Sequence, residues 1–536
     1  MERLYPTIDS VREAASAANI YGKKRVSAES LTAGDPYKQG PAFFKQILDP
    51  QFCRGLNNSF LAVWSHQPSL TVEPGIWNWD VINRNLTWWN FSRGFLDYIA
   101  RCQALLSQGK TVADVLYFYG EGTDLFVPSR EFLNPALPDG YNFDFINAEV
   151  LLRDLVFADG RLRVPSGSSW RYLVLPSRAK WEASAAVFLK LHALVSAGAT
   201  IIGPEPGLPP GLTAPGVEEM DASRAVAELW SGTAQAGRVS PGTDLESVFA
   251  LDRLHPDFTF TAETHGDDDR IRLEFIHRRM EDGADAYFVV NHSESAGAAR
   301  CSFRVADRAP ELWNPVTGGR RFLRAYHNLG CCTEVPLEFM PFESMFVLFR
   351  HPGTQAPAAG DDASLNFPKW NTVQAIKGPW EVRFDPAWGG PNETVYLPKL
   401  DDWTENPDPG IRYYSGTAVY STSFDLPPGA GPLLLDLGRV EVIASVRVNG
   451  TELGDVWCAP WQVALPAESL KATGNRIEIS VANLWINRLI RDATLPADQR
   501  LTSAEGYWRM GKDEALRPSG LLGPVLLKTP KHGDAA

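Results

Sequence analysis

Cysteine, long apolar runs and the signatures of several enzyme classes are scarce or missing in this 536-residue chain. Its six cysteines form no CxxC pair and no zinc-type spacing, which argues against a thiol redox motif and against the common structural zinc sites. No stretch reaches the ~20 apolar residues of a membrane span, and the N-terminus has no signal-peptide apolar run. GxSxG, HExxH and P-loop motifs do not occur, so the remaining residues favour hydrolysis by paired carboxylates.

An excess of acidic side chains, 64 against 51 basic ones, gives the chain a formal net charge of −13. Partners rich in phosphate require clustered Lys and Arg, so neither nucleic acid nor an anionic membrane is expected as the main partner. Tryptophan is abundant, with 17 residues. Indole rings stack on the C–H faces of sugars and also fill the cores of β-sandwiches, and composition alone leaves both uses open.

Residues 1–109 alternate between short apolar runs and helical patterns, which predicts the C-terminal part of a (β/α)8 barrel. The pattern predicts helices over 9–22, with Ser10 as the cap, and over 88–108, and a strand over 57–67. A complete barrel takes ~250 residues, so at most its last few βα units fit into this part of the chain.

The remainder of the chain divides into one α/β unit and two units of strands. Residues 111–250 alternate strand and helix, as in the doubly wound sheet of an amidotransferase-like domain. Residues 251–352 and 366–530 contain short period-two strands separated by turn signals. They predict a β-sandwich and a jelly roll of the sugar-binding type. The predicted fold class is therefore multidomain, α/β plus all-β.

Three glutamates stand where these elements would present catalytic groups. Glu29 follows a short apolar run, at the mouth of a predicted barrel strand, where partial desolvation suits a general acid. Glu121 ends the strand ADVLYFYG, where such sheets bind ligands, and Glu149 lies in the helical pattern FINAEVLL. Position alone favours solvated surface carboxylates for Glu121 and Glu149. Asp139, Asp144 and Glu149 also crowd one segment, which suits a cation with oxygen ligands but lacks EF-hand spacing.

Polar and aromatic residues suited to a sugar subsite follow the second barrel-like strand. His66 and Gln67 end that strand and offer donors to sugar hydroxyls. The segment beyond brings indole rings, a carboxylate and a guanidinium together: Trp77, Trp79, Asp80 and Arg84. We predict that these residues bind substrate. A loop anchored on the core by two indoles would have the same composition.

A series of short strings along the chain carries a family resemblance. They are AESLT (28–32), SHQP (65–68), TWW (87–89), ADVLY (113–117), PDGY (138–141), YLVLP (172–176), GAT (198–200), IHRR (276–279), NLWINRLI (483–490) and SGLLGP (519–524). In this order they resemble the α-L-rhamnosidases of glycoside hydrolase family 106. The ordered set covers nearly the whole chain and is more specific than any single string.

The resemblance implies an inverting, multidomain enzyme, associated with calcium, that removes terminal α-L-rhamnose from plant glycans or glycosides. Glu29 matches the family's motif glutamate, to which we assign the role of general acid. Glu121 matches the position of the general base, and Glu149 matches a further active-site glutamate, either base or linked to the cation. The sequence assigns no calcium ligand.

Length is the main departure from the family, whose members carry several hundred residues before the segment around Glu29. We therefore expect most of the barrel to be missing, with open sheet edges and exposed apolar surface. Two other interpretations stay open: a non-catalytic carbohydrate-binding remnant, and a β-galactosidase-like hydrolase with a similar set of domains. The compartment depends on the upstream sequence: periplasmic or extracellular after a signal peptide, cytoplasmic otherwise.

Overall fold

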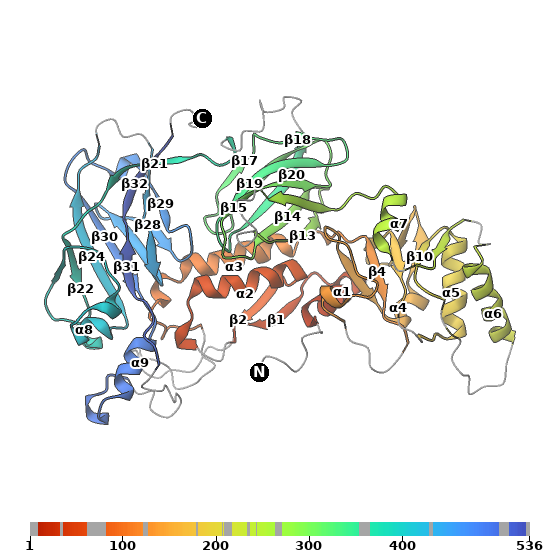
Figure 1. Cartoon of the computed structure of the whole chain (residues 1–536), viewed down its shortest axis with the longest axis horizontal. Coiled ribbons are helices and arrows are strands. Elements are labelled where there is room, and N and C mark those ends of the chain that lie inside the picture. Colours follow the sequence, from red (N-terminus) through yellow and green to blue (C-terminus); the bar gives the residue numbers. More distant parts are fainter. Residues whose placement is uncertain are drawn as a thin grey trace.

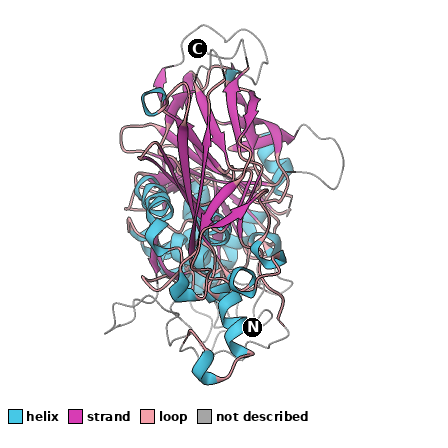
Figure 2. Cartoon of the chain, turned by 90° about the vertical axis from the view of Figure 1, so that its left-hand side faces the viewer, coloured by secondary structure: helices cyan, strands magenta, loops and turns pink. Residues whose placement is uncertain are grey.

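The computed structural model of the chain (Figure 1) describes residues 9–32, 36–61, 82–121, 127–177, 181–205, 207, 217–232, 236–242, 244–262, 271–352, 365–427, 432–502 and 514–531. Helices and a parallel sheet come first along the chain, and antiparallel sheets follow. Figure 2 shows the strands gathered toward one end of that view and the helices toward the other. Among these residues, no helix is both long enough and apolar enough for a bilayer crossing.

The N-terminal part combines helices with a short parallel sheet. Its elements are α1 (Ser10–Tyr21), β1 (Ser27–Ser30), α2 (Pro41–Arg54), β2 (Asn58–Leu61) and α3 (Arg93–Leu106). β1 pairs in parallel with β2, which places Glu29 opposite Phe60. Two apolar side chains are exposed in this part: Phe60 of β2 is 61% exposed, and Phe43 of α2 is 39% exposed.

Two details of this part differ from the sequence predictions. The cap of α1 is Asp9, not Ser10, because the Asp9 carboxylate accepts the Arg12 backbone N–H at 2.9 Å. α3 begins at Arg93 rather than at Trp88, and a 3-10 turn over Trp89–Phe91 precedes it. Such tight turns are frequent at helix starts, and here the Trp88 ring is completely buried beside Phe95.

A five-stranded parallel sheet follows, in the order β11-β10-β9-β4-β5. Its strands are β4 (Val115–Phe118), β5 (Phe143–Ile146), β9 (Tyr172–Val174), β10 (Thr200–Ile202) and β11 (Arg238–Ser240). The helices between and after them are α4 (Ala148–Arg153), α5 (Ala185–Ser196), α6 (Val217–Trp230) and α7 (Leu245–Leu251). A small antiparallel sheet joins β6 (Val156–Ala158), β7 (Arg161–Arg163) and β8 (Ser169–Trp170).

This part confirms the predicted alternation of strand and helix, with one correction. The segment FINAEVLL, predicted as a single helix, is divided between β5 and α4. Every residue of β5 is buried, as in a strand covered on both faces. Asn147 then ends the strand and caps α4, because its side chain accepts the Val150 backbone N–H.

The next part contains a four-stranded sheet, β12-β15-β19-β18, and a six-stranded sheet, β17-β16-β20-β14-β13-β3. The strands are β3 (Lys110–Thr111), β12 (Phe258–Ala262), β13 (Leu273–Arg279), β14 (Asp285–Asn291), β15 (Gly297–Phe303), β16 (Arg308–Trp313), β17 (Arg320–Phe322), β18 (His327–Asn328), β19 (Thr333–Phe339) and β20 (Ser344–Pro352). β3 comes from the chain before the parallel sheet, so the six-stranded sheet links segments far apart in sequence.

The C-terminal part contains sheets in the orders β21-β32-β25-β29, β23-β22-β24-β30-β27-β28 and β26-β31. The strands are β21 (Trp370–Ala375), β22 (Trp380–Arg383), β23 (Val395–Leu397), β24 (Thr417–Phe424), β25 (Leu433–Asp436), β26 (Arg439–Glu441), β27 (Ile443–Val448), β28 (Thr451–Val456), β29 (Gln462–Leu465), β30 (Asn475–Ala482), β31 (Gly520–Gly523) and β32 (Leu526–Pro530). Helices α8 (Pro409–Arg412) and α9 (Ile486–Ala493) correct the expectation of strands alone.

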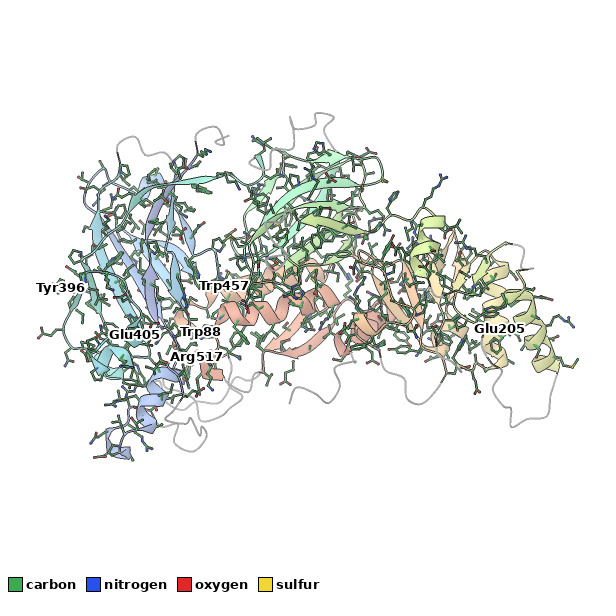
Figure 3. All side chains as sticks on the ribbon, viewed as in Figure 1. Trp88, Glu205, Tyr396, Glu405, Trp457 and Arg517 are labelled. Carbon is green, nitrogen blue, oxygen red and sulfur yellow. The ribbon has the colours of Figure 1, made fainter. Side chains whose placement is uncertain are left out.

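One apolar core joins the N-terminal helices to both antiparallel parts. Phe52 of α2 packs against Phe288 of β14, with ring centroids 6.1 Å apart. Phe95 of α3 packs against Trp457, which follows β28, at 5.3 Å. Figure 3 shows Trp457 beside Trp88, next to α3. Because these rings belong to a single buried cluster, the helices are held on two sides by strands from distant parts of the sequence.

A buried cluster of charges lies where the parallel sheet meets the next part. His277 of β13 is 1% exposed and lies between two carboxylates, Asp257 (Nδ1 to Oδ2, 3.0 Å) and Asp285 (Nε2 to Oδ1, 2.8 Å). The Arg304 guanidinium donates to Asp114, before β4, at 2.6 Å and lies 3.5 Å from Asp257. Burial alone would disfavour the imidazolium, but the two carboxylates outweigh it and raise the pKa of His277.

From this charge cluster we predict that the protein is most stable between about pH 4 and 6.5 and less stable at lower and at higher pH. The pKa of His277 is raised, so its stabilisation is complete below about pH 6.5, the ordinary His value, and is lost as the pH rises through the folded pKa. Burial opposes ionisation of Asp257 and Asp285, yet the charge and hydrogen bonds of His277 lower the pKa of both. Their stabilisation is complete above about pH 4 and is lost as the pH falls through their folded pKa values.

We expect the melting temperature to decline as the pH is raised from about 6.5. In His277→Gln this alkaline decline should be weaker, because the glutamine amide stays neutral at every pH. Differential scanning fluorimetry of both proteins over a pH series measures this. Equal slopes above pH ~6.5 would contradict a charged His277 in the folded protein.

Candidate active site

Glu29 lies on β1, and its side chain is exposed. The Thr32 hydroxyl donates a hydrogen bond to Glu29 Oε1 at 2.9 Å. Across the sheet, Phe60 lies opposite Glu29 and is itself 61% exposed. A carboxyl and an apolar ring therefore lie side by side on the open face of β1 and β2, in an arrangement that leaves the carboxyl accessible to a ligand.

Glu121 and Glu149 occupy equivalent positions at one edge of the parallel sheet. β4 and β5 are neighbours, and their final residues, Phe118 and Ile146, are paired in register. Glu121 and Glu149 each follow three residues later, so both lie beyond the carboxyl ends of these strands. Ligands of open α/β sheets bind at that edge. This pairing was not predicted, because the end of β5, from Phe145, was assigned to a helix.

The two carboxylates have different partners. Glu121 accepts hydrogen bonds from Ser184, through the backbone N–H at 2.6 Å and the hydroxyl at 3.1 Å. Ser184 is the N-cap of α5, so the Glu121 carboxylate lies at the positive end of a helix. Glu149 is 60% exposed and forms an ion pair with Arg153, one turn along α4. An exposed pair of this kind is typical of a solvated helix surface.

Helix α1 relates the edge of the parallel sheet to β1. α1 lies antiparallel to β5, since Ser16 accepts the Phe145 N–H at 3.1 Å and Asn19 donates to Asp144 at 3.0 Å. The start of α1 therefore lies toward the carboxyl edge of the sheet, where Asp9 donates its N–H to the Val127 carbonyl at 2.9 Å.

The chain then reverses after α1. Val26, just before β1, packs on Ala15 and Ala18 of α1, so β1 begins against this helix. The segment after β1 contacts Trp485 and Glu514 of the C-terminal part. Glu29 lies on β1, and Glu121 follows β4, a strand of a different sheet.

Of the predicted sugar-binding residues, only Arg84 lies in the described part of the chain. His66, Gln67, Trp77, Trp79 and Asp80 lie outside it. Arg84 is half-buried and is flanked by Asn83 and Asn85, which are 2% and 6% exposed. The Asn85 carbonyl accepts the Trp485 Nε1–H at 2.6 Å, so this segment is anchored to the C-terminal part.

The C-terminal part also contacts the segment that follows β1. Lys38 Nζ lies 2.5 Å from Glu514 Oε1, and Tyr37 packs with Trp485 and Leu489. Asn487 of α9 holds the Arg517 backbone by accepting its N–H and donating to its carbonyl, each at 2.8 Å. Figure 3 shows Arg517 near Trp88 and α9. The string NLWINRLI thus borders Tyr37, in the segment that follows β1, a role that no local pattern indicated.

The sequence analysis did not single out the direct partners of the glutamates. Thr32 was part of the string AESLT, and its place three residues after Glu29 on an exposed strand end was the available signal. Ser184 begins an apolar helix pattern and so could be identified as a cap, but its bond to Glu121 spans 63 residues. Contacts between residues so far apart in the sequence depend on the order of the strands in the sheet.

The acidic residues considered for a cation do not form a ligand set. Asp144 is buried, and its oxygens already accept hydrogen bonds from Asn19 and Trp170, each at 3.0 Å. Asp139 points into solvent, 3.9 Å from Arg130, and Glu149 is paired with Arg153. Within the described ranges no three His, Cys, Asp or Glu side chains come together as metal ligands. These residues therefore do not fit calcium.

Comparison with known proteins finds a matching family model, a related sequence and a similar solved structure. The family model described as alpha-L-rhamnosidase matches residues 2–327. A Formosa agariphila protein named "Putative beta-glucuronidase" is 32% identical over 97% of this chain and 64% of its own length. The solved rhamnosidase of Novosphingobium sp. PP1Y is 33% identical over 97% of this chain, with a TM-score of 0.84. This chain spans about half the length of that structure, 49%.

Proposed function

The chain belongs to the glycoside hydrolase family of α-L-rhamnosidases, and we propose that it serves the removal of terminal α-L-rhamnose from plant glycans or glycosides. The family is one of glycosidases, so the substrate is a glycan and the reaction is hydrolysis of a glycosidic bond. The strongest support is the likeness to a solved rhamnosidase over 97% of the chain.

We propose an inverting mechanism with two carboxyl groups. Glu29 protonates the oxygen of the leaving group, and Glu121 removes a proton from the water that attacks the anomeric carbon from the opposite face. Both bonds to that carbon change in one step, so the configuration is inverted. For a water to fit, the two carboxyls must stand roughly 6.5–9.5 Å apart around the sugar. Glu149 is the alternative base.

Three features of the molecule support these roles. Glu29 is exposed on β1 opposite the exposed ring of Phe60, where a ligand can reach it. Glu121 is held at the start of α5 by two hydrogen bonds from Ser184, which fixes its position for contact with a water. Glu149 is engaged by Arg153 on an exposed helix face, which makes it the weaker candidate for the base.

The same likeness supports the finer description of the fold. We interpret 1–109 as the last part of a (β/α)8 barrel and 111–250 as an amidotransferase-like domain. We interpret 251–352 as a β-sandwich and 366–530 as a jelly roll. On this interpretation Arg84 and the neighbouring predicted residues line the sugar subsite at the carboxyl ends of the barrel strands. Calcium is left without assigned ligands.

The experiment that tests the function is incubation of the purified protein with an aryl α-L-rhamnoside and with an aryl β-glucuronide. We expect release of rhamnose, and NMR during the first turnovers should show the β-anomer first. Rhamnose that appears first as the α-anomer would overturn inversion. Release from the glucuronide alone would favour the activity in the name of the Formosa agariphila relative. Binding of rhamnosides without turnover would favour the carbohydrate-binding interpretation.

Replacement of the proposed base separates the two candidates. We expect Glu121→Gln to lower turnover of aryl and oligosaccharide substrates by similar factors, about 100-fold or more, because both reactions need an activated water. Glu149→Gln should change turnover little, since it removes only an exposed ion pair. Steady-state kinetics of both variants on both substrates is the measurement. If the large loss occurs in Glu149→Gln instead, the base is Glu149.

A further inference from the structure

Strand β17 forms a basic edge on a chain with an excess of acid. We call this surface the β17 edge and define it by Arg320, Arg321, Phe322, Arg324 and Arg350. β17 is the outermost strand of the six-stranded sheet, and all three of its residues are exposed. Figure 1 places it in the upper part of the view, while β1 and β2 lie lower, below α2. The β17 edge is thus separate from the candidate active site.

Aromatic rings hold the guanidinium groups of this edge in place. The Arg320 Cζ lies 3.8 Å from the centroid of the Trp313 ring, and Arg350 covers the same indole at 5.0 Å. Arg321 lies 5.0 Å from the Phe367 ring. Stacked guanidiniums keep their N–H groups directed outward in the plane, where they can meet a carboxylate with little loss of side-chain freedom.

The positive charge of the β17 edge is only partly compensated, because Glu343 interacts electrostatically with Arg321 but forms no ion pair with it. Glu311 binds Arg350, with contacts of 3.2 and 3.0 Å. In the part of the chain that the structure describes, no carboxylate lies within 4.0 Å of the guanidinium nitrogens of Arg320, Arg321 or Arg324. Three unpaired arginines within five residues are unusual on a chain of net charge −13. Such a local field attracts anions while the rest of the surface repels them.

Protection of a sheet edge is the ordinary reason for charge on an outer strand. That purpose is met by either sign of charge and needs no aromatic support. Other outer strands of this protein differ: β21 reads WNTVQA without a charge, and β28 reads TELGDV with two acids. Arginine is therefore not present on every outer strand of this chain. The stacked and unpaired arginines of the β17 edge therefore indicate a binding site for a ligand.

We propose that the β17 edge binds an acidic polysaccharide, one whose sugar units carry carboxylates. Each guanidinium offers a forked pair of donors that matches a carboxylate. Phe322 is 56% exposed between these arginines and gives the C–H face of a sugar ring an apolar platform. Nucleic acid is disfavoured because the basic area is small and the chain as a whole is acidic. This proposal does not depend on the proposed catalytic function.

The test measures binding of the purified chain to polygalacturonate, to neutral dextran of similar length and to a DNA duplex, by biolayer interferometry. We expect binding to polygalacturonate only. The affinity of the triple variant Arg320→Gln/Arg321→Gln/Arg324→Gln for polygalacturonate should be lower by about tenfold or more. A matched control, Arg412→Gln/Arg447→Gln/Arg476→Gln, removes three arginines from the C-terminal part and should bind as the wild type does.

Two further variants provide a test of binding if the triple variant does not fold. Arg324→Gln and Phe322→Ser change exposed side chains and should each weaken binding without a change in melting temperature. Equal affinity for DNA and polygalacturonate would overturn the assignment to a glycan. No binding, or equal losses in the triple variant and its control, would overturn the site itself. None of these readouts requires hydrolysis, so failure here and failure of the proposed function are distinguishable.

Discussion

Turnover of a rhamnose-capped oligosaccharide should fall about 100- to 10,000-fold when Glu29 is replaced by Gln in the active enzyme. The sugar leaving group departs as an alkoxide unless its oxygen is protonated, and the glutamine amide has no proton to give. An aryl leaving group is stable as a phenolate and should suffer a much smaller loss. Because Gln has nearly the same shape as Glu, binding of the sugar should change little. Kinetics on both substrates measures the difference.

The assignment of Glu29 as the general acid depends on the comparison between the aryl and the sugar substrates. A matched control is Glu281→Gln, which removes a carboxylate that is 81% exposed and paired at 3.5 Å with Lys24. We expect this control to keep its turnover, since exposed pairs contribute little. Equal losses on the aryl and sugar substrates in Glu29→Gln would show that Glu29 acts in something other than proton donation. Unchanged rates would remove it from the active site.

Loss of Asp257 should destabilise the protein by about 3–5 kcal/mol. Asp257 is 1% exposed and accepts hydrogen bonds from His277 at 3.0 Å and from the Tyr287 hydroxyl at 2.9 Å. Asp257→Ala leaves the buried imidazolium with Asp285 alone and leaves Arg304 with one carboxylate fewer. Desolvation of those charges is then no longer offset. Urea unfolding measures the change in the free energy of unfolding.

Two comparisons show whether burial causes this loss. Asp401 is 56% exposed and pairs with Lys399 at 2.7 Å, so Asp401→Ala should cost less than about 1 kcal/mol. Asp257→Asn keeps an acceptor of the same shape and should fall between the two, which provides a measurement if Asp257→Ala does not fold. A loss in Asp257→Ala no greater than in Asp401→Ala would mean that water reaches the cluster and screens its charges.

Much of the architecture follows from local patterns. The buried run VLYF of β4 and the apolar helix α5 were predictable because burial of a strand on both faces, or of a helix along one side, leaves a distinct periodicity. The errors occur where two signals overlap. β5 and α4 share one apolar segment, so the boundary between strand and helix depends on contacts outside the segment. Asp9 and Ser10 are both good caps, and the choice between them also depends on such contacts.

The sequence by itself determined the family, through ordered strings, and the candidate carboxylates, through their places at the ends of apolar runs. Only the tertiary structure decided which of these carboxylates occupy equivalent positions and which form hydrogen bonds with other residues. Glu121 and Glu149 share one edge because β4 and β5 are neighbours in the sheet, and Glu121 meets Ser184 across 63 residues. The β17 edge likewise exists because Trp313 and Arg320 are paired in register. Strand order and register are set by packing of distant segments, which no local pattern encodes.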